Sequence, residues 1–252
     1  MDKGQKEKEY FLAALRNQFE LSRQGDCPRF SCFLNEQQQV VAMEIAKKSQ
    51  MVFRFFGGFS AATRKMLGVF PTYIEPTDDL FPIVGFTVSY PSSFSLSHRD
   101  FLGTLMAQQI KRETVGDIVI QSGTAYVFIE EKLERVLSTQ IDKVGGVGVS
   151  ITAGTPKNIT VEQLFKELRG TLASLRLDAS VSLVTGISRE KAAKLIASGA
   201  VLLNYTEKSE GSVPLSEGDI LSVRGYGKFR LSAVGGQTKK GRTSVQFDAY
   251  SN

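Results

Sequence analysis

The C-terminal third of the chain is organised around the stretch RLDASVSLVTGISREKAAKLIASGAVLLN, residues 176–204. Its first half carries apolar residues at helical spacing and ends at Gly186, which predicts one short helix. Ser188 is typical of the N-cap of a second helix, and Gly199 ends that helix before the apolar run AVLLN. The stretch therefore predicts two helices followed by a strand.

The second predicted helix carries three cations, Arg189, Lys191 and Lys194. Arg189 falls in the first turn, where free backbone N–H groups favour the binding of a phosphate. Lys191 and Lys194 share the arc of the helix that faces away from its apolar residues. Charged helix faces are usually only solvated, so the helix alone does not decide whether these cations bind a ligand.

The distribution of charge along the chain favours binding. Residues 169–252 hold 12 Lys and Arg against 7 Asp and Glu, which accounts for the whole net charge of +5 of this 252-residue chain. Residues 1–168 hold 19 basic and 19 acidic side chains and are neutral. Such an asymmetry indicates a polyanion-binding module attached to a neutral body.

More cations follow the helix pair. Three strands are predicted there, separated by turns that contain glycine. The segments RGYGKFR, residues 224–230, and TKKGR, residues 238–242, add six cations. Tyr226 and Phe229 interleave with them, which suits stacking on bases. Composition and spacing together predict a module that binds structured RNA.

The order of these motifs resembles the S-four RNA-binding domain, which is named after a protein of the small ribosomal subunit. The resemblance is carried by residues 176–204 together with SVPLSEGDILSVRGYGKF, which ends at Phe229. It implies that the two helices and the adjoining loop present a basic face to structured RNA. From the charge pattern and the resemblance together, the residues expected to bind RNA are Arg176, Ser188, Arg189, Lys191, Lys194, Asn204, Arg224, Tyr226, Lys228, Phe229, Arg230, Lys239, Lys240 and Arg242.

Residues 1–74 predict a separate N-terminal α/β domain. A helical pattern runs over about residues 6–23, and Asn35 with Gln38 forms a capping box at the start of a second helix. The run MVFRFF then predicts a buried strand.

Residues 77–155 predict a strand, a helix, two strands, a helix and a closing strand. This βαββαβ order is that of a ferredoxin-like sheet and is shared with RNA-recognition modules. Tyr126 and Phe128 share one side of the third strand, and Phe86 and Tyr90 share one side of the first. Either pair could stack on RNA or belong to the core, and the sequence leaves this open.

The predicted fold is therefore α+β, with an N-terminal α/β domain, an RRM-like ferredoxin domain and an S-four-type domain of two helices and a small sheet. The pattern VEQLFKELRG predicts a connecting helix before the last of these. The predicted boundaries are 1–74, 77–155, 156–175 for the connecting helix and linker, and 176–252.

Two further stretches, FFGGFSAATRKMLGVFPTY and SHRDFLGTLMAQQIKRETVGDI, together with the C-terminal module, resemble the bacterial YlmH family over nearly the whole chain. The resemblance implies a non-enzymatic, ribosome-associated RNA-binding protein without a cofactor. It implies that the partners are large-subunit rRNA, peptidyl-tRNA and the large ribosomal subunit itself. The implied role is the rescue of stalled large subunits, while a C-terminal tail is added to the nascent chain.

The sequence lacks the motifs of common catalytic and metal sites. His98-Arg99-Asp100 spells the start of a kinase catalytic loop, but Leu105 stands where that loop requires Asn. His98 is the only histidine, which excludes a His-based triad or a multi-His metal site within one chain. The glycines of residues 145–148 fit neither a dinucleotide fingerprint nor a P-loop.

The alternative function is an RNA-modifying enzyme. Pseudouridine synthases carry their catalytic aspartate in a GRLD motif, which Asp178 matches in part. Leu175 replaces the glycine of that motif, and Val181 replaces the hydroxyl residue expected three positions after the aspartate. Asp178 is therefore predicted to be a carboxylate at the start of a helix. A protein adaptor that uses residues 1–155 is a third hypothesis, compatible with RNA binding.

Composition also limits where the chain is expected to act. No apolar run approaches the roughly 18 residues that span a bilayer. The N-terminal segment has no hydrophobic region of a secretory signal. Cys27 and Cys32 are too few for a disulfide framework and fit no common metal spacing. We therefore expect a cytoplasmic monomer with reduced thiols and no membrane partner.

Overall fold

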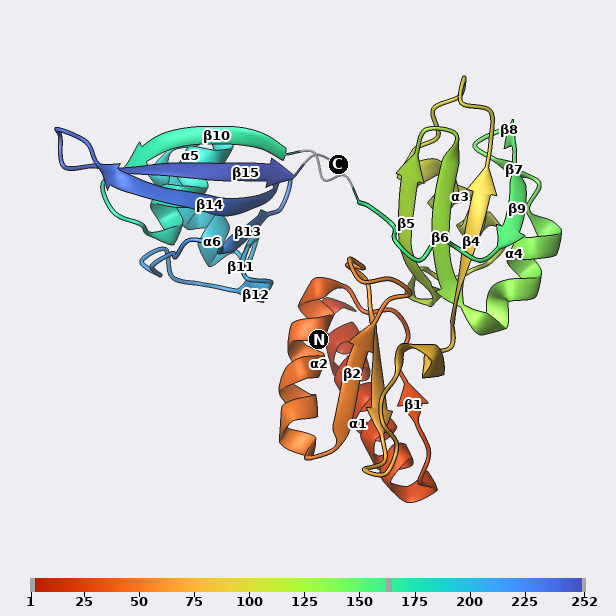
Figure 1. The fold of residues 1–252 in the computed structure, drawn as a ribbon. Helices are drawn as coiled ribbons and strands as arrows, with labels where there is room; N and C mark the ends of the chain where they lie inside the picture. The colour runs from red at the N-terminus through yellow and green to blue at the C-terminus, as the bar shows by residue number, and fades with distance from the viewer. Residues whose placement is uncertain (1–2, 162–164, 251–252) are drawn as a thin grey trace. The chain divides into compact units, whose positions relative to one another are not determined.

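The computed structural model describes residues 3–161 and 165–250, and the chain divides into two compact units, residues 1–161 and residues 162–252 (Figure 1). Each unit combines α-helices with β-strands. The chain is therefore of the mixed α and β class that the sequence predicts. The predicted domains 1–74 and 77–155 share the first unit, although each has its own sheet.

The first part of the N-terminal unit is a three-stranded antiparallel sheet with two helices packed on it. Leu15 and Phe19 of the first helix and Ala46 of the second pack on Val69 in the central strand. The elements are α1 (Lys3–Gly25), β1 (Arg29–Phe30), α2 (Glu36–Ser49), β2 (Val52–Phe56) and β3 (Met66–Phe70), with strand order β1-β3-β2.

The start of α2 confirms the predicted capping box. The Asn35 side chain accepts a hydrogen bond from the Gln38 backbone N–H at 2.8 Å, and the Gln38 side chain accepts one from the Asn35 N–H at 2.9 Å. These two bonds satisfy N–H groups that have no partner within the helix.

The second part of the N-terminal unit is a four-stranded antiparallel sheet with strand order β5-β6-β4-β9. One helix follows the first strand and another follows the third, which gives the βαββαβ order that the sequence predicts. Ferredoxin-like sheets share this order. The elements are β4 (Ile83–Ser89), α3 (His98–Ala107), β5 (Val115–Gln121), β6 (Thr124–Glu130), α4 (Glu134–Gln140) and β9 (Ser150–Ala153).

Short elements complete this part of the chain. A small hairpin precedes β9, and single 3₁₀ turns lie before β4, before β5 and after β6. They are β7 (Lys143–Val144), β8 (Val147–Gly148), η1 (Asp78–Leu80), η2 (Arg112–Thr114) and η3 (Glu131–Leu133).

Both faces of the four-stranded sheet are covered at their centre. Phe86 and Tyr90 pack under the helices with Phe101 of α3. On the opposite face Phe59 stacks on Phe128, with ring centroids 4.9 Å apart, and Phe128 is 1% exposed. Phe86, Tyr90 and Phe128 are therefore core residues, which decides a question that the sequence left open.

Glycine makes the contact between Phe59 and Phe128 possible. Gly58 has φ +97°, and a Cβ there would lie 2.3 Å from Cδ1 of Phe128. Only a residue without a side chain fits a backbone that passes so close to the ring. The Gly57-Gly58 pair therefore brings the segment after β2 onto the second sheet.

Arg64 also links the two sheets of the N-terminal unit. Its guanidinium donates hydrogen bonds to the carbonyl oxygens of Val115 at 2.9 Å and Phe33 at 3.0 Å. Burial, together with the nearby Arg112, lowers the pKa of Arg64 to about 10. The guanidinium thus stays charged at neutral pH and satisfies carbonyls of β5 and of the segment between β1 and α2.

The C-terminal unit is a six-stranded antiparallel sheet with two helices on one face (Figure 1). Strand order is β10-β15-β14-β13-β11-β12. The elements are β10 (Phe165–Leu172), α5 (Leu177–Thr185), α6 (Arg189–Ala197), β11 (Val201–Leu203), β12 (Thr206–Glu207), β13 (Ile220–Val223), β14 (Gly227–Gln237) and β15 (Thr243–Tyr250).

The predicted connecting helix of residues 156–175 is wrong, because Phe165–Leu172 form β10. This strand pairs along its length with β15, from Phe165 opposite Tyr250 to Leu172 opposite Thr243. Leu168 and Leu172 are four residues apart, and this spacing would place them on the same side of a helix and also on the same face of a strand. Their spacing therefore does not distinguish a helix from a strand.

Gly170 explains how closely α5 packs on this strand. A Cβ at this position would lie 2.6 Å from Cδ1 of Leu183, so the glycine lets α5 pack directly on β10. In the sequence alone, this glycine indicates the end of a helix, because glycine is common just after the last helical residue. Because β10 belongs to the C-terminal sheet, that unit begins earlier than the predicted residue 176.

Candidate nucleic-acid interface

The helix pair of the C-terminal unit has the local structure that the sequence predicts. Gly186 ends α5 in the left-handed region with φ +72°. Ser188 then caps α6, because its Oγ accepts a hydrogen bond from the backbone N–H of Lys191 at 3.3 Å. The structure thus shows a structural role for Ser188, which the sequence places among the RNA-binding residues.

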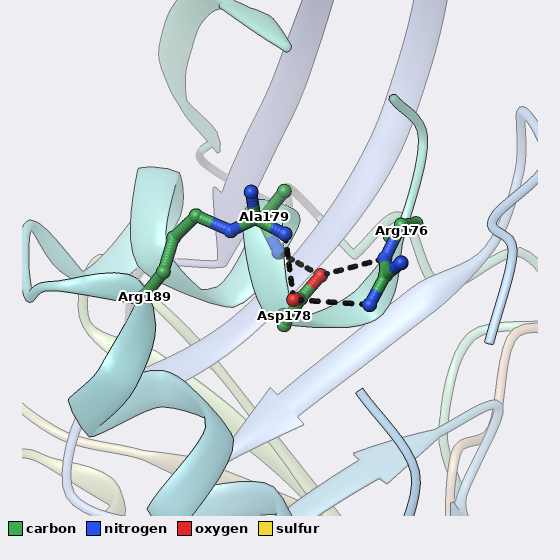
Figure 2. A network of polar contacts seen from close by, with 4 residues as sticks. All are labelled: Arg176, Asp178, Ala179 and Arg189. Atoms are coloured by element: carbon green, nitrogen blue, oxygen red, sulfur yellow. Dashed lines mark hydrogen bonds and ion pairs between the residues drawn. The ribbon is translucent and has the colours of Figure 1, made fainter. Parts of the chain in front are cut away.

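Asp178 joins the N-terminal ends of the two helices (Figure 2). Its Oδ2 accepts a hydrogen bond from Nη2 of Arg189 at 2.7 Å, and its Oδ1 accepts one from Nε of Arg176 at 3.2 Å. Oδ1 also accepts one from the backbone N–H of Ala179 at 2.8 Å. The carboxylate therefore holds an arginine from each side of the turn between the helices.

The charges of this cluster are arranged with the anion inside and the cations outside. The side chain of Asp178 is 12% exposed, whereas those of Arg176 and Arg189 are 43% and 57% exposed. Burial raises the pKa of Asp178, but the hydrogen bonds from Arg189 and Arg176 outweigh this, so the pKa lies below its ordinary value. The residue remains a carboxylate at neutral pH, and two guanidinium groups face solvent.

The two arginines retain the capacity to bind an anion. A guanidinium carries five N–H donors in a planar fork, and Asp178 engages only Nη2 of Arg189 among the contacts of the described residues. The surface also lies at the N-terminus of α6, where the helix dipole favours negative charge. The arrangement can therefore hold phosphate oxygens.

The lysines of α6 are more loosely placed. Lys194 pairs with Glu190 at 2.7 Å, but both side chains are more than 70% exposed, so solvent screens the pair. Lys191 is also exposed. These side chains can contribute charge to the surface without fixed geometry.

The residues predicted to form one basic face lie on both sides of the C-terminal sheet. Lys228 and Arg230 of β14 alternate with Phe229 and Leu231, which pack under the helices. Because side chains alternate along a strand, the two cations project from the face away from α5 and α6. The structure does not bring them together with Arg189.

Phe229 is a correction to the sequence prediction. Its side chain is 5% exposed and belongs to the core between the sheet and the helices. A base could stack on it only if the core opened. Tyr226, in the turn before β14, is 48% exposed and remains available for stacking.

Two other predicted residues hold turns. The Asn204 side chain accepts a hydrogen bond from the Ile220 N–H at 2.9 Å and donates one to Asp219 at 2.8 Å, while its backbone has φ +49°. Arg242 donates to Oγ1 of Thr171 at 3.0 Å and to its carbonyl oxygen at 2.7 Å. The structure therefore gives Asn204 and Arg242 structural contacts.

The remaining predicted residues are exposed at the ends of strands. Arg224 lies in the turn between β13 and β14 with Tyr226, and Lys239 and Lys240 lie in the loop between β14 and β15. They are free to approach a polyanion.

Sequence reasoning missed two features of this surface. It read Asp178 as a helix-start carboxylate and did not pair it with Arg189, because the two are 11 positions apart. It also did not use Phe165 and Tyr250, which meet edge to face at 5.0 Å on the outside of the sheet. The alternation in β15 could have indicated the second feature.

Other kinds of site find no support in the described residues. They contain no group of three or more His, Cys, Asp or Glu side chains placed to hold a metal ion. None of the helices seen in residues 3–161 and 165–250 is both long and apolar enough to cross a bilayer. Instead, the helix pair α5 and α6, with its exposed guanidinium groups, forms a surface suited to binding polymers that carry phosphate groups.

Comparison with known proteins identifies the family. A family model described as "Putative RNA-binding domain in YlmH" matches residues 76–158. A curated relative from Bacillus subtilis (strain 168), "Ribosome-associated protein quality control protein P2", is 32% identical over 218 residues, which cover 86% of this chain and 85% of the relative. The chain belongs to the YlmH family.

A solved structure shares the fold over part of the chain. "Cell division protein ylmH from Streptococcus pneumoniae" superposes with a TM-score of 0.52 at 23% identity. The match covers 59% of this chain and 92% of the other.

Proposed function

We propose that this protein is a ribosome-associated RNA-binding factor without a catalytic centre, which acts in the cytoplasm in the quality control of stalled translation. The observation that carries the proposal is the Asp178 cluster, where Arg176 and Arg189 are held at the surface with their guanidinium groups toward solvent. The family match to an RNA-binding domain and the name of the Bacillus relative support it.

The proposed docking surface is the helix pair. Arg176 and Arg189 bind phosphates in fixed geometry, and Lys191 and Lys194 add charge. Phosphate contacts of this kind position a protein on RNA by shape, without reading sequence. The resemblance to the S-four domain supports structured RNA as the ligand, and the resemblance to the YlmH family supports rRNA and tRNA on the large ribosomal subunit.

The alternative of a pseudouridine synthase fits the cluster less well. Both carboxylate oxygens of Asp178 accept hydrogen bonds from guanidinium groups, and the residue is 8% exposed. A carboxylate that acts on a base must reach it, whereas this one is covered by the arginines that it holds. The positioning of Arg176 and Arg189 accounts for Asp178 without any reaction.

In the domain that contains the four-stranded sheet, RNA would not bind by stacking on aromatic rings at the centre of that sheet. The family model that matches residues 76–158 names an RNA-binding domain, yet Phe128 lies under Phe59. Phe94, in the loop before α3, is 51% exposed and Tyr126 is partly exposed. Contacts from this domain would come from its loops and its rim.

The test is the affinity of the full chain for an rRNA stem-loop as a function of salt. If about 5 phosphates are neutralised, log K falls against log salt with a slope of roughly −3.5 to −4.5. The control variant is Lys47→Ala, which should show the same slope as the unsubstituted chain. Lys47 is exposed on α2 and does not belong to the proposed surface. A slope near zero, or no co-sedimentation with large ribosomal subunits, contradicts the proposal.

A further inference from the structure

The face of the C-terminal sheet that points away from α5 and α6, here called the outer sheet face, carries aromatic rings and cations side by side. Its side chains come from β10, β14 and β15, which lie next to one another in the sheet (Figure 1). Within the described residues of this unit, both helices lie on the opposite face. The residues that matter are Phe165, Arg169, Lys228, Arg230, Asp248 and Tyr250.

The pairing register places these side chains together. Phe165 lies opposite Tyr250 on the neighbouring strand, and Arg230 lies opposite Asp248. The neighbours Leu231 and Phe247 are a pair in the same ladder and are fully buried under the helices. Because strand side chains alternate, the first two pairs share the outer sheet face.

Two cations on this face contact aromatic rings, while Arg169 pairs with Glu167 at 2.8 Å. The Lys228 ammonium lies 4.7 Å from the ring centroid of Tyr250 and 5.3 Å from that of Tyr205. The Arg230 guanidinium lies 5.2 Å from the centroid of Phe165. Cation–π contacts hold long side chains along the sheet surface. The Phe165 residue is nevertheless 36% exposed, and Tyr250 is half-buried, so part of each ring can be reached from solvent.

The centre of the face is held by a second carboxylate. Asp248 accepts hydrogen bonds from Nη2 of Arg230 and from Oγ of Ser232, both at 2.8 Å. The Asp248 side chain is 11% exposed, whereas that of Arg230 is 41% exposed. As in the Asp178 cluster, a buried carboxylate fixes a guanidinium that faces solvent.

We infer that the outer sheet face binds single-stranded RNA, with bases stacked on Tyr250 and Phe165 and phosphates contacted by Lys228 and Arg230. Exposed rings on a sheet are used by unpaired bases, whereas a duplex keeps its bases stacked within the helix. The inference goes beyond the proposed docking of structured RNA on the helix pair.

The charge of the surroundings favours a nucleic acid over a protein partner. Arg169, Lys228 and Arg230 face only Glu167 and Asp248 among the acidic side chains of β10, β14 and β15 on this face. The loop between β14 and β15 adds two exposed lysines. A polyanion gains from this excess of cations along the hairpin, while an acidic peptide would lack bases to fill the ring surface.

The two RNA-binding surfaces can be occupied together, because they lie on opposite sides of one sheet. The chain can therefore join a structured RNA element to an adjacent unpaired strand.

The experiment measures binding of a labelled ten-nucleotide oligouridine to the full chain by fluorescence anisotropy. Tyr250→Leu keeps apolar bulk but removes the ring, and it should weaken binding about tenfold. Ser244→Ala is the matched control, since Ser244 is an exposed residue at the other end of the same face. Equal affinity of Tyr250→Leu and the unsubstituted chain overturns the inference. Thermal unfolding checks that each variant is folded.

Ultraviolet crosslinking of the unsubstituted chain to the same oligouridine gives a second readout that needs no variant. Crosslinked peptides that contain Tyr250 or Phe165 support the inference, and crosslinks confined to α5 and α6 overturn it. Arg189→Ala separates this inference from the proposed function. That variant should lose stem-loop affinity and keep oligouridine affinity, so failure of either surface is seen independently of the other.

Discussion

Arg189 and Asp178 form an ion pair of 2.7 Å between the N-terminal ends of two different helices. The contact spans the turn at Gly186. It therefore fixes both the angle between α5 and α6 and the direction in which the guanidinium of Arg189 points. A cation at a helix N-terminus is placed against the helix dipole, which costs stability in the absence of an anion. Asp178 supplies that anion within the chain and leaves Arg189 at the surface.

Replacing Asp178 by Asn tests whether the carboxylate positions the arginines. The substitution removes a negative charge from a cationic surface, so general electrostatics alone predicts tighter RNA binding. Positioning predicts weaker binding, because Arg176 and Arg189 lose their anchor. We also expect a loss of about 1–3 kcal/mol in the free energy of unfolding. Urea denaturation and anisotropy with a stem-loop RNA measure the two effects, and tighter binding would exclude the positioning role.

Acid should weaken the C-terminal unit through the same residue. The pKa of Asp178 is lower in the folded chain than its unfolded value of about 3.9. Its contribution to stability is therefore present above pH 4 and is lost as the pH falls toward the folded pKa. Stability curves at pH 6 and pH 3 should differ less for Asp178→Asn than for the unsubstituted chain. An equal difference would show that Asp178 does not titrate with unfolding.

The sequence predicts local features of this chain well and long-range contacts less well. The capping box at Asn35, the cap at Ser188 and the turn at Gly186 depend on residues within four positions of one another, and all three are confirmed. The helix predicted for the segment before residue 176 failed because Leu168 and Leu172 fit both periodicities. The strand is decided by its partner β15, which lies far away in the sequence.

The candidate site shows the same limit. Charge counting located the cationic module in the C-terminal third, but it could not separate the two faces of a sheet. Phe229 and Lys228 are adjacent in sequence and point to opposite sides, one into the core and one outward. Only the register of β14 with its neighbours shows which of them can meet RNA.

Gly170→Ala distinguishes the strand from the predicted helix. In an exposed helix this change stabilises by up to about 1 kcal/mol. In β10 the new methyl group would lie 2.6 Å from Leu183, so we expect destabilisation of the C-terminal unit. Gly103→Ala is the matched control, because Gly103 lies in α3 and an added Cβ there would meet no atom of another part of the chain within 4 Å, so the substitution should stabilise. Thermal unfolding of both variants checks the prediction, which fails if Gly170→Ala raises the melting temperature.

Two aromatic residues near the start of β14 should respond in opposite ways to truncation. Phe229→Ala removes a core ring and should lower the free energy of unfolding by about 3–5 kcal/mol. Tyr226→Ala should leave stability nearly unchanged, because its ring is 48% exposed. If Tyr226 stacks on a base, its loss weakens RNA affinity several-fold in the folded variant. Calorimetry and anisotropy on the same samples separate the effects, and an unfolding transition unaffected by Phe229→Ala would contradict the core assignment.

The arginine and the lysine of α6 should differ in their contribution to RNA affinity. Arg189 is held by Asp178 in a fixed direction, so its N–H groups meet a phosphate with little loss of conformational freedom. Lys194 is solvated and paired with Glu190, and its charge is screened. Arg189→Ala should weaken stem-loop binding by about tenfold or more, and Lys194→Ala by less than about threefold. Each variant removes one charge, so the salt dependence should change by a similar amount in both. Equal losses of affinity at fixed salt would show that charge alone, and not the geometry set by Asp178, determines binding.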